Sequence, residues 1–309
     1  MQSISRRSFV VQSTLTATGF LGLNSWTGLA IDPIKRSGPP RLLLSLAAYS
    51  FRDYFIDSNH KRDKKTEPGK RMDLFGFIDY CAAHGCAGTE LTSYYFPAKL
   101  TDEFLIKIKR HAFLKGVEIS GTAVGNTFTP PPGEARDKQI KDVKAWIDHA
   151  ALLGAPHIRV FAGTAEAGGK AESKKRCIAA LEECCDYAGK YGIFLGIENH
   201  GGIVAEADDL IDIIRAVKSQ WVGVNLDTGN FHTADVYADI AKLAPYAVNV
   251  QLKGEIQPLG GKKQPSDLPR LMKILKDSGY SGYVALEYES AEDPYQQVPV
   301  LLGQMKALM

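Results

Sequence analysis

The stretch Ile193–Asn199 reads IFLGIEN and follows directly on a helical pattern at Glu172–Tyr191. Its residues Ile193, Leu195 and Ile197 alternate with other side chains, which is typical of a β-strand. Gly192 separates the two patterns, and a glycine in this position provides the left-handed conformation that ends many helices. A helix that leads at once into a strand is the repeating unit of a parallel α/β sheet.

The same unit recurs from residue 41 to the end of the chain. Further helical patterns include Asp137–Leu153 and Leu268–Ser278. The predicted strands are Leu42–Ser50, Ala87–Thr92, Val117–Val124, His157–Ala162, Ile193–Asn199, Trp221–Asp227, Ala247–Lys253 and Tyr283–Glu289. Eight strand–helix units in about 270 residues are typical of a closed barrel, and no glycine-rich phosphate turn follows the first strand. We therefore predict an α/β fold, a single-domain (β/α)8 TIM barrel over residues 41–309.

The first thirty residues have the features of an export signal. The segment Ser5–Val10 contains Arg6-Arg7 and resembles the twin-arginine signal of bacteria. A weakly apolar stretch and the small residues at 28–30 follow it. The stretch is too polar and too short for a stable transmembrane helix, so we expect no stable membrane insertion of the protein after signal cleavage. We predict a signal peptide at residues 1–30, a linker at 31–40, and a periplasmic or extracellular protein.

Charge and cysteine content exclude other classes of protein. The chain has 309 residues, is 45% hydrophobic and carries a net charge of +2, for which Arg6 and Arg7 account. The neutral remainder gives no electrostatic reason to expect a nucleic-acid partner. The five cysteines form an odd set without the spacing of a zinc site, so we expect buried thiols rather than disulfides.

Polar residues occupy the last inward-facing positions of four predicted strands. Alternate side chains of a barrel strand face the lumen, and the apolar set faces the helices. The last inward residues of the final four strands are Glu198, Asp227, Gln251 and Glu287. Buried acids need compensating charge, which a divalent cation supplies, and an all-oxygen set favours Mn²⁺ or Mg²⁺, with Co²⁺ or Zn²⁺ open. The alternative is a buried salt network with Arg159, Lys253 or His200.

Several motifs carry a family resemblance. They read GIENHGG at 196–202, NLDTGN at 225–230, ALE at 285–287 and APHIRVFAG at 155–163. Together they resemble the sugar phosphate isomerase/epimerase family of xylose-isomerase-like TIM barrels. In that family a Glu, an Asp, a His and a Glu bind one divalent metal ion, and the two glutamates act as acid and base. The resemblance implies these roles for Glu198, Asp227 and Glu287, whereas Gln251 replaces the histidine and would ligate more weakly.

This set of residues supports proton transfer next to a carbonyl group. A metal ion that chelates a carbonyl and the neighbouring hydroxyl stabilises an enediolate, while Glu198 and Glu287 remove and return the proton. We therefore predict a metal-dependent isomerase or epimerase acting on a small sugar or keto-sugar. The predicted substrate-binding residues are Tyr49, Glu90, Arg159, His200, Asn230 and Lys253.

The same barrel is compatible with other functions. A dehydratase or keto-sugar lyase begins with the same proton abstraction. An exported sugar-binding barrel without catalysis would explain the replacement by Gln251. A zinc-dependent endonuclease needs a histidine cluster and a basic groove, which seven histidines and a neutral remainder disfavour. The sequence leaves a homo-oligomer open.

Overall fold

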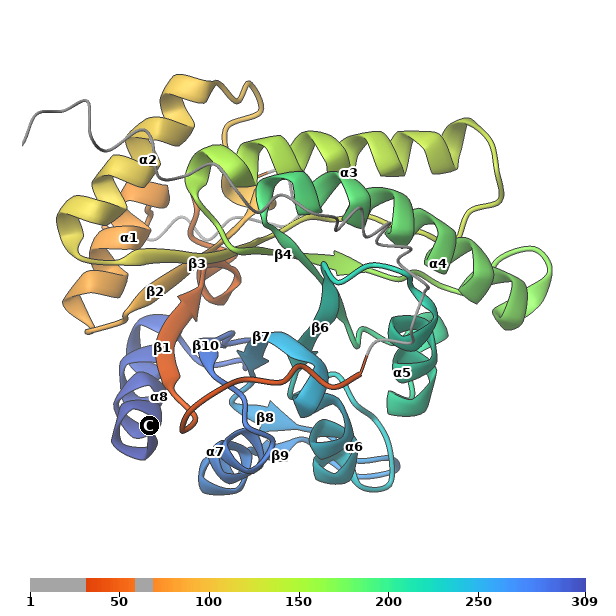
Figure 1. Cartoon of the computed structure of the whole chain (residues 1–309). Coiled ribbons are helices and arrows are strands. Elements are labelled where there is room, and N and C mark those ends of the chain that lie inside the picture. Colours follow the sequence, from red (N-terminus) through yellow and green to blue (C-terminus); the bar gives the residue numbers. More distant parts are fainter. Residues whose placement is uncertain (1–31, 59–68) are drawn as a thin grey trace, which may run out of the picture.

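Eight parallel strands close into a barrel in the computed structural model, which describes residues 32–58 and 69–309. The strand order around the barrel is β1-β10-β7-β6-β5-β4-β3-β2, and helices surround it (Figure 1). The strands are β1 (Leu42–Ala47), β2 (Gly88–Thr92), β3 (Glu118–Ala123), β4 (His157–Phe161), β5 (Phe194–Glu198), β6 (Val222–Asp227), β7 (Ala247–Leu252) and β10 (Gly282–Leu286). The predicted TIM barrel is confirmed.

The helices cover the outside of the barrel. They are α1 (Leu74–Ala83), α2 (Asp102–Lys115), α3 (Glu134–Leu153), α4 (Gly169–Ala188), α5 (Ala207–Ala216), α6 (Val236–Leu243), α7 (Leu268–Asp277) and α8 (Pro294–Leu308). Helix α2 begins at Thr101, whose side chain accepts a hydrogen bond from Phe104 N, and ends at Gly116 with φ 69°. Helix α3 ends in the same way at Gly154, with φ 80°. The glycines expected at helix ends are confirmed there.

The first strand is shorter than predicted. It ends at Ala47, and a 3₁₀ turn, η1 (Ala48–Phe51), follows it. The Ser50 hydroxyl donates to Leu286 O at 3.1 Å and accepts from Tyr288 N at 2.9 Å. These bonds tie the turn to the chain after β10. The turn places Tyr49 at the rim of the barrel, because the chain bends instead of continuing as a strand.

A small hairpin after β7 was not predicted. Its strands are β8 (Glu255–Ile256) and β9 (Gln264–Pro265), which pair antiparallel. Two-residue strands are too short to show a periodic pattern, and glycines at 260 and 261 lie between them. Leu259 N donates to Thr233 O at 2.9 Å, so the loop of this hairpin is attached to the loop after β6.

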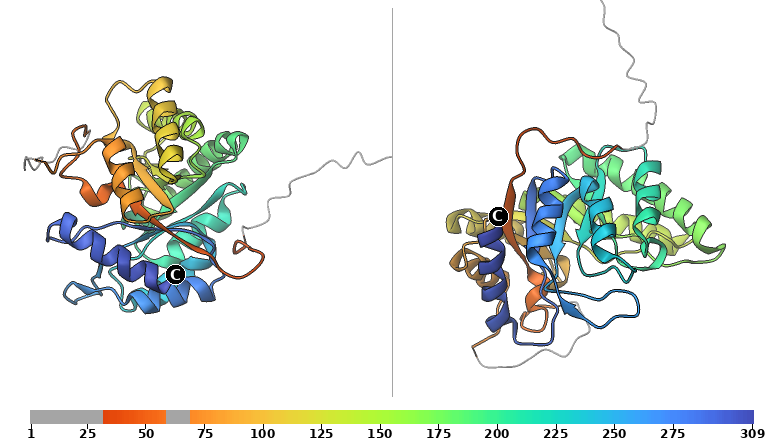
Figure 2. Two further views of the ribbon diagram at one scale, coloured as in Figure 1. Left: turned by 90° about the vertical axis from the view of Figure 1, so that its left-hand side faces the viewer. Right: turned by 90° about the horizontal axis from the view of Figure 1, so that it is seen from below.

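The segment before β1 runs past β10 to the N-terminal end of β7 (Figure 2). Ile34 N donates to Pro245 O at 2.9 Å, and the Arg36 guanidinium donates to Ala247 O at 2.6 Å. The predicted signal peptide lies outside the described residues. The five cysteines are buried and free, as predicted. None of the helices within residues 32–58 and 69–309 has the length and apolar character needed to cross a membrane.

Candidate active site

A cavity of about 280 Å³ opens at the C-terminal ends of the barrel strands. Its walls include seven of the predicted site residues: Tyr49, Arg159, Glu198, His200, Asn230, Lys253 and Glu287. The remaining lining residues are Tyr94, Phe161 and Glu289. The C-terminal end of the strands is where TIM-barrel enzymes place their active sites, and the volume suits a small ligand.

Glu198, the last residue of β5, is fixed through both carboxylate oxygens. Arg159 Nε lies 2.9 Å from Glu198 Oε2, and Asn230 Nδ2 donates to Glu198 Oε1 at 2.7 Å. Arg159 also donates to Val124 O at 3.1 Å. Because β4 and the loop after β6 supply these partners, the carboxylate is held in one orientation.

Lys253, directly after β7, lies among three carboxylates. Its ammonium is 2.7 Å from Glu287 Oε2, 2.6 Å from Glu289 Oε2 and 3.2 Å from Asp227 Oδ2. The lysine side chain is only 9% exposed. Charge-assisted contacts of this length in a water-poor site orient both partners. The buried salt network that was the alternative to a metal site is therefore present in part: Glu198 pairs with Arg159, and Glu287 pairs with Lys253.

Asp227, at the end of β6, is completely buried and only partly satisfied. Its Oδ1 accepts from Gly229 N at 2.8 Å and from Asn230 N at 3.0 Å. Its Oδ2 has no hydrogen-bond partner and faces the Lys253 ammonium. The Asn199 side chain, bonded to the Asp227 backbone N and O at 2.9 Å each, fixes the strand end. One carboxyl oxygen thus accepts no hydrogen bond, and Asp227 itself lies outside the lining of the cavity.

Burial dominates the acid–base properties of the site. It raises the pKa of Glu198 to about 7, with Arg159 opposing and Glu287 adding to the shift. Burial likewise raises the pKa of Asp227 to about 8, although Lys253 opposes it. Desolvation disfavours the charged form of a carboxyl group, and neighbouring carboxylates add repulsion. Two cations, Arg159 and Lys253, face four carboxyl groups here, so acidic groups outnumber cations in the described site, and burial favours the protonated form of two of them.

Gln251 and Glu90 lie outside the lining of this cavity and belong to a buried amide layer. Gln251 Nε2 donates to Glu90 Oε1 at 2.6 Å, and Asn225 Nδ2 donates to Gln251 Oε1 at 2.6 Å. Asn249 Nδ2 lies 2.8 Å from Glu90 Oε2 and 2.8 Å from Asn225 Oδ1. Glu90 is completely buried, and burial raises its pKa to about 7. The structure thus places these two predicted residues in hydrogen bonds with neighbouring strands.

The site offers carboxyl oxygens, which are the type of donor that a cation such as Mg²⁺ or Mn²⁺ prefers. Glu198, Asp227 and Glu287 are buried, and Asp227 Oδ2 is a buried carboxyl oxygen that accepts no hydrogen bond. Such oxygens are ligands for Mg²⁺ and Mn²⁺. The Lys253 ammonium lies between Asp227 and Glu287, and in the described residues no three His, Cys, Asp or Glu side chains are already gathered about one metal position. Gln251 would contribute only through an oxygen that already accepts a hydrogen bond from Asn225.

Aromatic side chains form one wall of the cavity. The Phe161 ring lies 4.7 Å from the His200 ring, and the Arg159 guanidinium lies 3.9 Å above Phe161. The rings of Tyr49 and Tyr94 are 6.4 Å apart with an edge-to-face geometry. Burial, with Arg159 nearby, lowers the pKa of His200, so its neutral ring is favoured.

Sequence reasoning missed three lining residues. Phe161 and Glu289 follow Arg159 and Glu287 by two positions, so continuing the inward alternation would have found them. Tyr94 lies in η2 (Ser93–Tyr95), a 3₁₀ turn after β2. No periodic pattern marks that turn, and its position in the cavity wall depends on how the chain leaves the strand.

Comparison with known proteins agrees with the fold. The sequence model of a family described as xylose isomerase-like TIM barrel matches residues 78–304. An inosose isomerase from Halalkalibacterium halodurans is 28% identical over 240 residues, covering 71% of this chain and 83% of the relative.

Two solved structures show the same barrel. D-psicose 3-epimerase with D-tagatose from Clostridium cellulolyticum H10 has a TM-score of 0.65 at 15% identity, covering 81% of this chain and 86% of the other. The IOLI protein with a bound zinc atom has a TM-score of 0.68 at 18% identity, covering 86% of this chain and 96% of the other.

Proposed function

The chain belongs to the xylose isomerase-like TIM barrel family, and we propose that it is a divalent-metal-dependent sugar isomerase or epimerase. The relatives named above include an isomerase and a sugar epimerase. One observation carries the proposal: Glu198 and Glu287 enter the same cavity from separate strand ends. Two carboxyl groups that reach a bound sugar from different sides can remove a proton and return it.

The surrounding residues hold the two carboxylates in place for this task. Arg159 and Asn230 fix Glu198, and Lys253 fixes Glu287. Because burial raises the pKa of Glu198 to about 7, this group can take up and release a proton near neutral pH. Tyr49 and Phe161 give the cavity an apolar surface against which a sugar ring packs, and His200 lies at its edge.

Glu198, Asp227 and Glu287 would hold the cation, with the Gln251 oxygen as the weakest ligand. When bound, the cation polarises the carbonyl and stabilises negative charge that develops on its oxygen. It also balances the excess of carboxylates in the cavity. Mn²⁺ or Mg²⁺ is the cation that we propose from the oxygen donors.

Solvent-deuterium exchange tests the proposal directly. The purified protein is incubated in D₂O with a panel of keto-sugars, before and after dialysis against a chelator, and deuterium uptake next to the carbonyl is followed by NMR. We expect uptake with at least one sugar, loss after dialysis, and recovery with Mn²⁺ or Mg²⁺. A protein that binds no divalent cation and exchanges no proton in any sugar would contradict the proposal.

A matched control separates the site from the rest of the surface. Glu134→Gln, on the exposed start of α3, removes the same charge outside the cavity. This variant should exchange as the wild type does.

We also propose export by the twin-arginine route. The support is the Arg6-Arg7 motif and the apolar stretch behind it. Expression in a bacterium with and without the twin-arginine translocase tests this: we expect the protein in the periplasm only when the translocase is present. Arg6→Lys with Arg7→Lys should keep the protein in the cytoplasm.

A further inference from the structure

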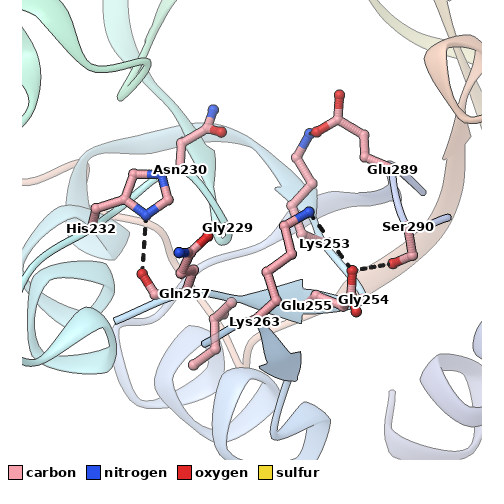
Figure 3. Close-up of a pocket in the computed structure, with 11 residues that line it drawn as sticks. Gly229, Asn230, His232, Lys253, Gly254, Glu255, Gln257, Lys263, Glu289 and Ser290 are labelled. Atoms are coloured by element: carbon pink, nitrogen blue, oxygen red, sulfur yellow. Dashed lines mark hydrogen bonds and ion pairs between the residues drawn. The ribbon is translucent and has the colours of Figure 1, made fainter. Parts of the chain in front are cut away.

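A second pocket, of about 150 Å³, adjoins the candidate active site (Figure 3). Three neighbouring loops form it: the loop after β6, the hairpin β8–β9 after β7, and the loop after β10. The lining residues are Gly229, Asn230, His232, Lys253, Gly254, Glu255, Ile256, Gln257, Lys263, Glu289 and Ser290. All three loops lie on the C-terminal face of the barrel, where substrates bind in this fold.

The two pockets share part of their wall. Asn230, Lys253 and Glu289 line both of them. Asn230 holds the catalytic candidate Glu198, and Lys253 holds Glu287. The boundary between the pockets therefore consists of polar side chains that contact the reaction site. A molecule with its reacting part beside Glu198 and Glu287 can extend past this boundary into the second pocket.

The charges of the second pocket disfavour a phosphate group. Lys253 is paired with Glu287 and Glu289, and Lys263 Nζ lies 3.9 Å from Glu255 Oε2. Both described lysines of the lining thus already face carboxylates. A phosphate dianion would meet Glu255 and Glu289 without an unpaired lysine from this lining to compensate, and such like-charge contacts are costly.

Neutral hydrogen-bonding groups remain for a ligand. His232 Nδ1 donates to Gln257 O at 3.0 Å, because a carbonyl can only accept, and this leaves Nε2 of the ring for another partner. Ser290 Oγ donates to Glu255 Oε2 at 2.6 Å and keeps its own lone pairs. Alternating donors and acceptors of this kind match hydroxyl groups, each of which donates once and accepts twice.

Close backbone packing shapes the wall. A Cβ on Gly229 would lie 2.6 Å from Lys253 Cγ and 3.0 Å from Glu255 O. Only a residue without a side chain allows the loop after β6 and the hairpin segment to approach this closely. The pocket is therefore a built part of the rim, formed by loops that pack against each other.

We propose that this second pocket binds a second hydroxylated unit that is joined to the reacting sugar, so that the preferred substrate is a glycoside or a disaccharide. The inference rests on the proposed function and names its substrate class. The reacting ring occupies the larger cavity beside Glu198 and Glu287. The attached unit lies against His232, Gln257 and Ser290, and its hydroxyl groups exchange hydrogen bonds with them.

Matched substrates test the inference. Deuterium exchange is measured for a hexose whose ketone is at a ring carbon other than the anomeric carbon, its methyl glycoside, its 6-phosphate and a disaccharide that contains the same keto-sugar, so that the glycosidic bond leaves the ketone free. Two or three additional hydrogen bonds correspond to a rise in kcat/KM of about tenfold or more for the disaccharide. We expect that preference over the free sugar and the methyl glycoside, and no comparable gain for the phosphate.

Variants locate the source of the preference. His232→Ala and Lys263→Ala each alter the lining of the second pocket, and both residues are exposed, so the barrel should fold. We expect each to reduce the ratio of disaccharide to free-sugar kcat/KM severalfold. Lys262→Ala removes the same charge one residue outside the lining and should keep the ratio of the wild type.

Each outcome has a distinct meaning. If the free keto-sugar exchanges with the same kcat/KM as the disaccharide, the proposal that a second unit binds is wrong, and the proposed function stays in place. A preference for the 6-phosphate would contradict the inference that the second pocket binds a neutral ligand. A disaccharide preference that His232→Ala and Lys263→Ala leave intact places the second unit elsewhere and overturns the assignment. No exchange with any of the substrates overturns the proposed function and this inference together.

Discussion

The lumen of the barrel contains two polar layers with opposite properties. In the lower layer, Glu90, Asn225, Asn249 and Gln251 bond one another at 2.6 to 2.8 Å in complete burial. In the upper layer, Glu198 and Glu287 line an open cavity, and Asp227 lies behind them against Lys253. Inward polar residues therefore do not by themselves mark a reaction site. Access to a cavity distinguishes the carboxyl groups of the upper layer from the buried groups of the lower one.

The largest effect should follow from neutralising the upper-layer carboxylates. Glu287→Gln and Glu198→Gln each remove a proton acceptor, and general acid–base catalysis contributes about 10²- to 10⁴-fold in rate. We expect deuterium exchange to fall by that factor, measured by NMR. Circular dichroism should show an unchanged fold, because both side chains reach the open cavity. Exchange at the wild-type rate in both variants would remove these residues from the chemistry.

Lys253→Met should destabilise the protein strongly. The substitution removes the cation that faces Asp227, Glu287 and Glu289, and an uncompensated buried charge costs about 3 to 5 kcal/mol. The free energy of unfolding in urea measures the loss. Added Mn²⁺ should restore part of it if the cation binds the same carboxylates. Lys242→Met, on the exposed surface of α6, is the matched control and should cost far less.

His157 should make stability depend on acid pH. It lies on β4 two positions before Arg159, and burial lowers its pKa to about 4. Below the ordinary histidine pKa of about 6.5 the unfolded chain binds a proton that the folded chain does not, so stability is lost as the pH falls towards 4. The loss amounts to about 3 kcal/mol.

Comparison with a non-titrating variant isolates this contribution. His157→Gln should remove that pH dependence in urea unfolding between pH 7 and 4. Glu90, Glu198 and Asp227 act in the opposite sense, because their pKa values are raised to about 7, 7 and 8 and their contributions are lost as the pH rises towards those values. Since both proteins contain these three groups, the difference between their profiles reports His157. Identical profiles would show that His157 does not titrate in this range.

The smallest effect should come from the lower layer. Gln251→Leu leaves Glu90 Oε1 and Asn225 Nδ2 without their partner, which costs about 1 to 3 kcal/mol. Divalent-cation affinity, measured by calorimetry, should fall less than in Asp227→Asn, because Asp227 provides a carboxyl oxygen that accepts no hydrogen bond. A larger fall in affinity for Gln251→Leu would make Gln251 a principal ligand and join the two layers into one site.

The sequence predicted most of the site because strand alternation is a local property. Glu198, Arg159 and Glu287 occupy inward positions that the apolar residues on either side define. The partner of Gln251 could not be predicted, because Glu90 lies 161 residues away along the chain and meets Gln251 only when the barrel closes. The position of Tyr94 depends on a 3₁₀ turn that has no periodic pattern.

The hairpin β8–β9 has a consequence for how this protein can diversify. Its strands pair only with each other and add no hydrogen bond to the ladder of the barrel. Insertions or exchanges in residues 257–263 would leave the hydrogen-bond ladder that supports the core intact, since connecting segments of this kind tolerate variation. Selection can therefore alter which molecules are admitted while the proton-transfer residues stay fixed, and laboratory evolution of new specificities would best begin in that segment.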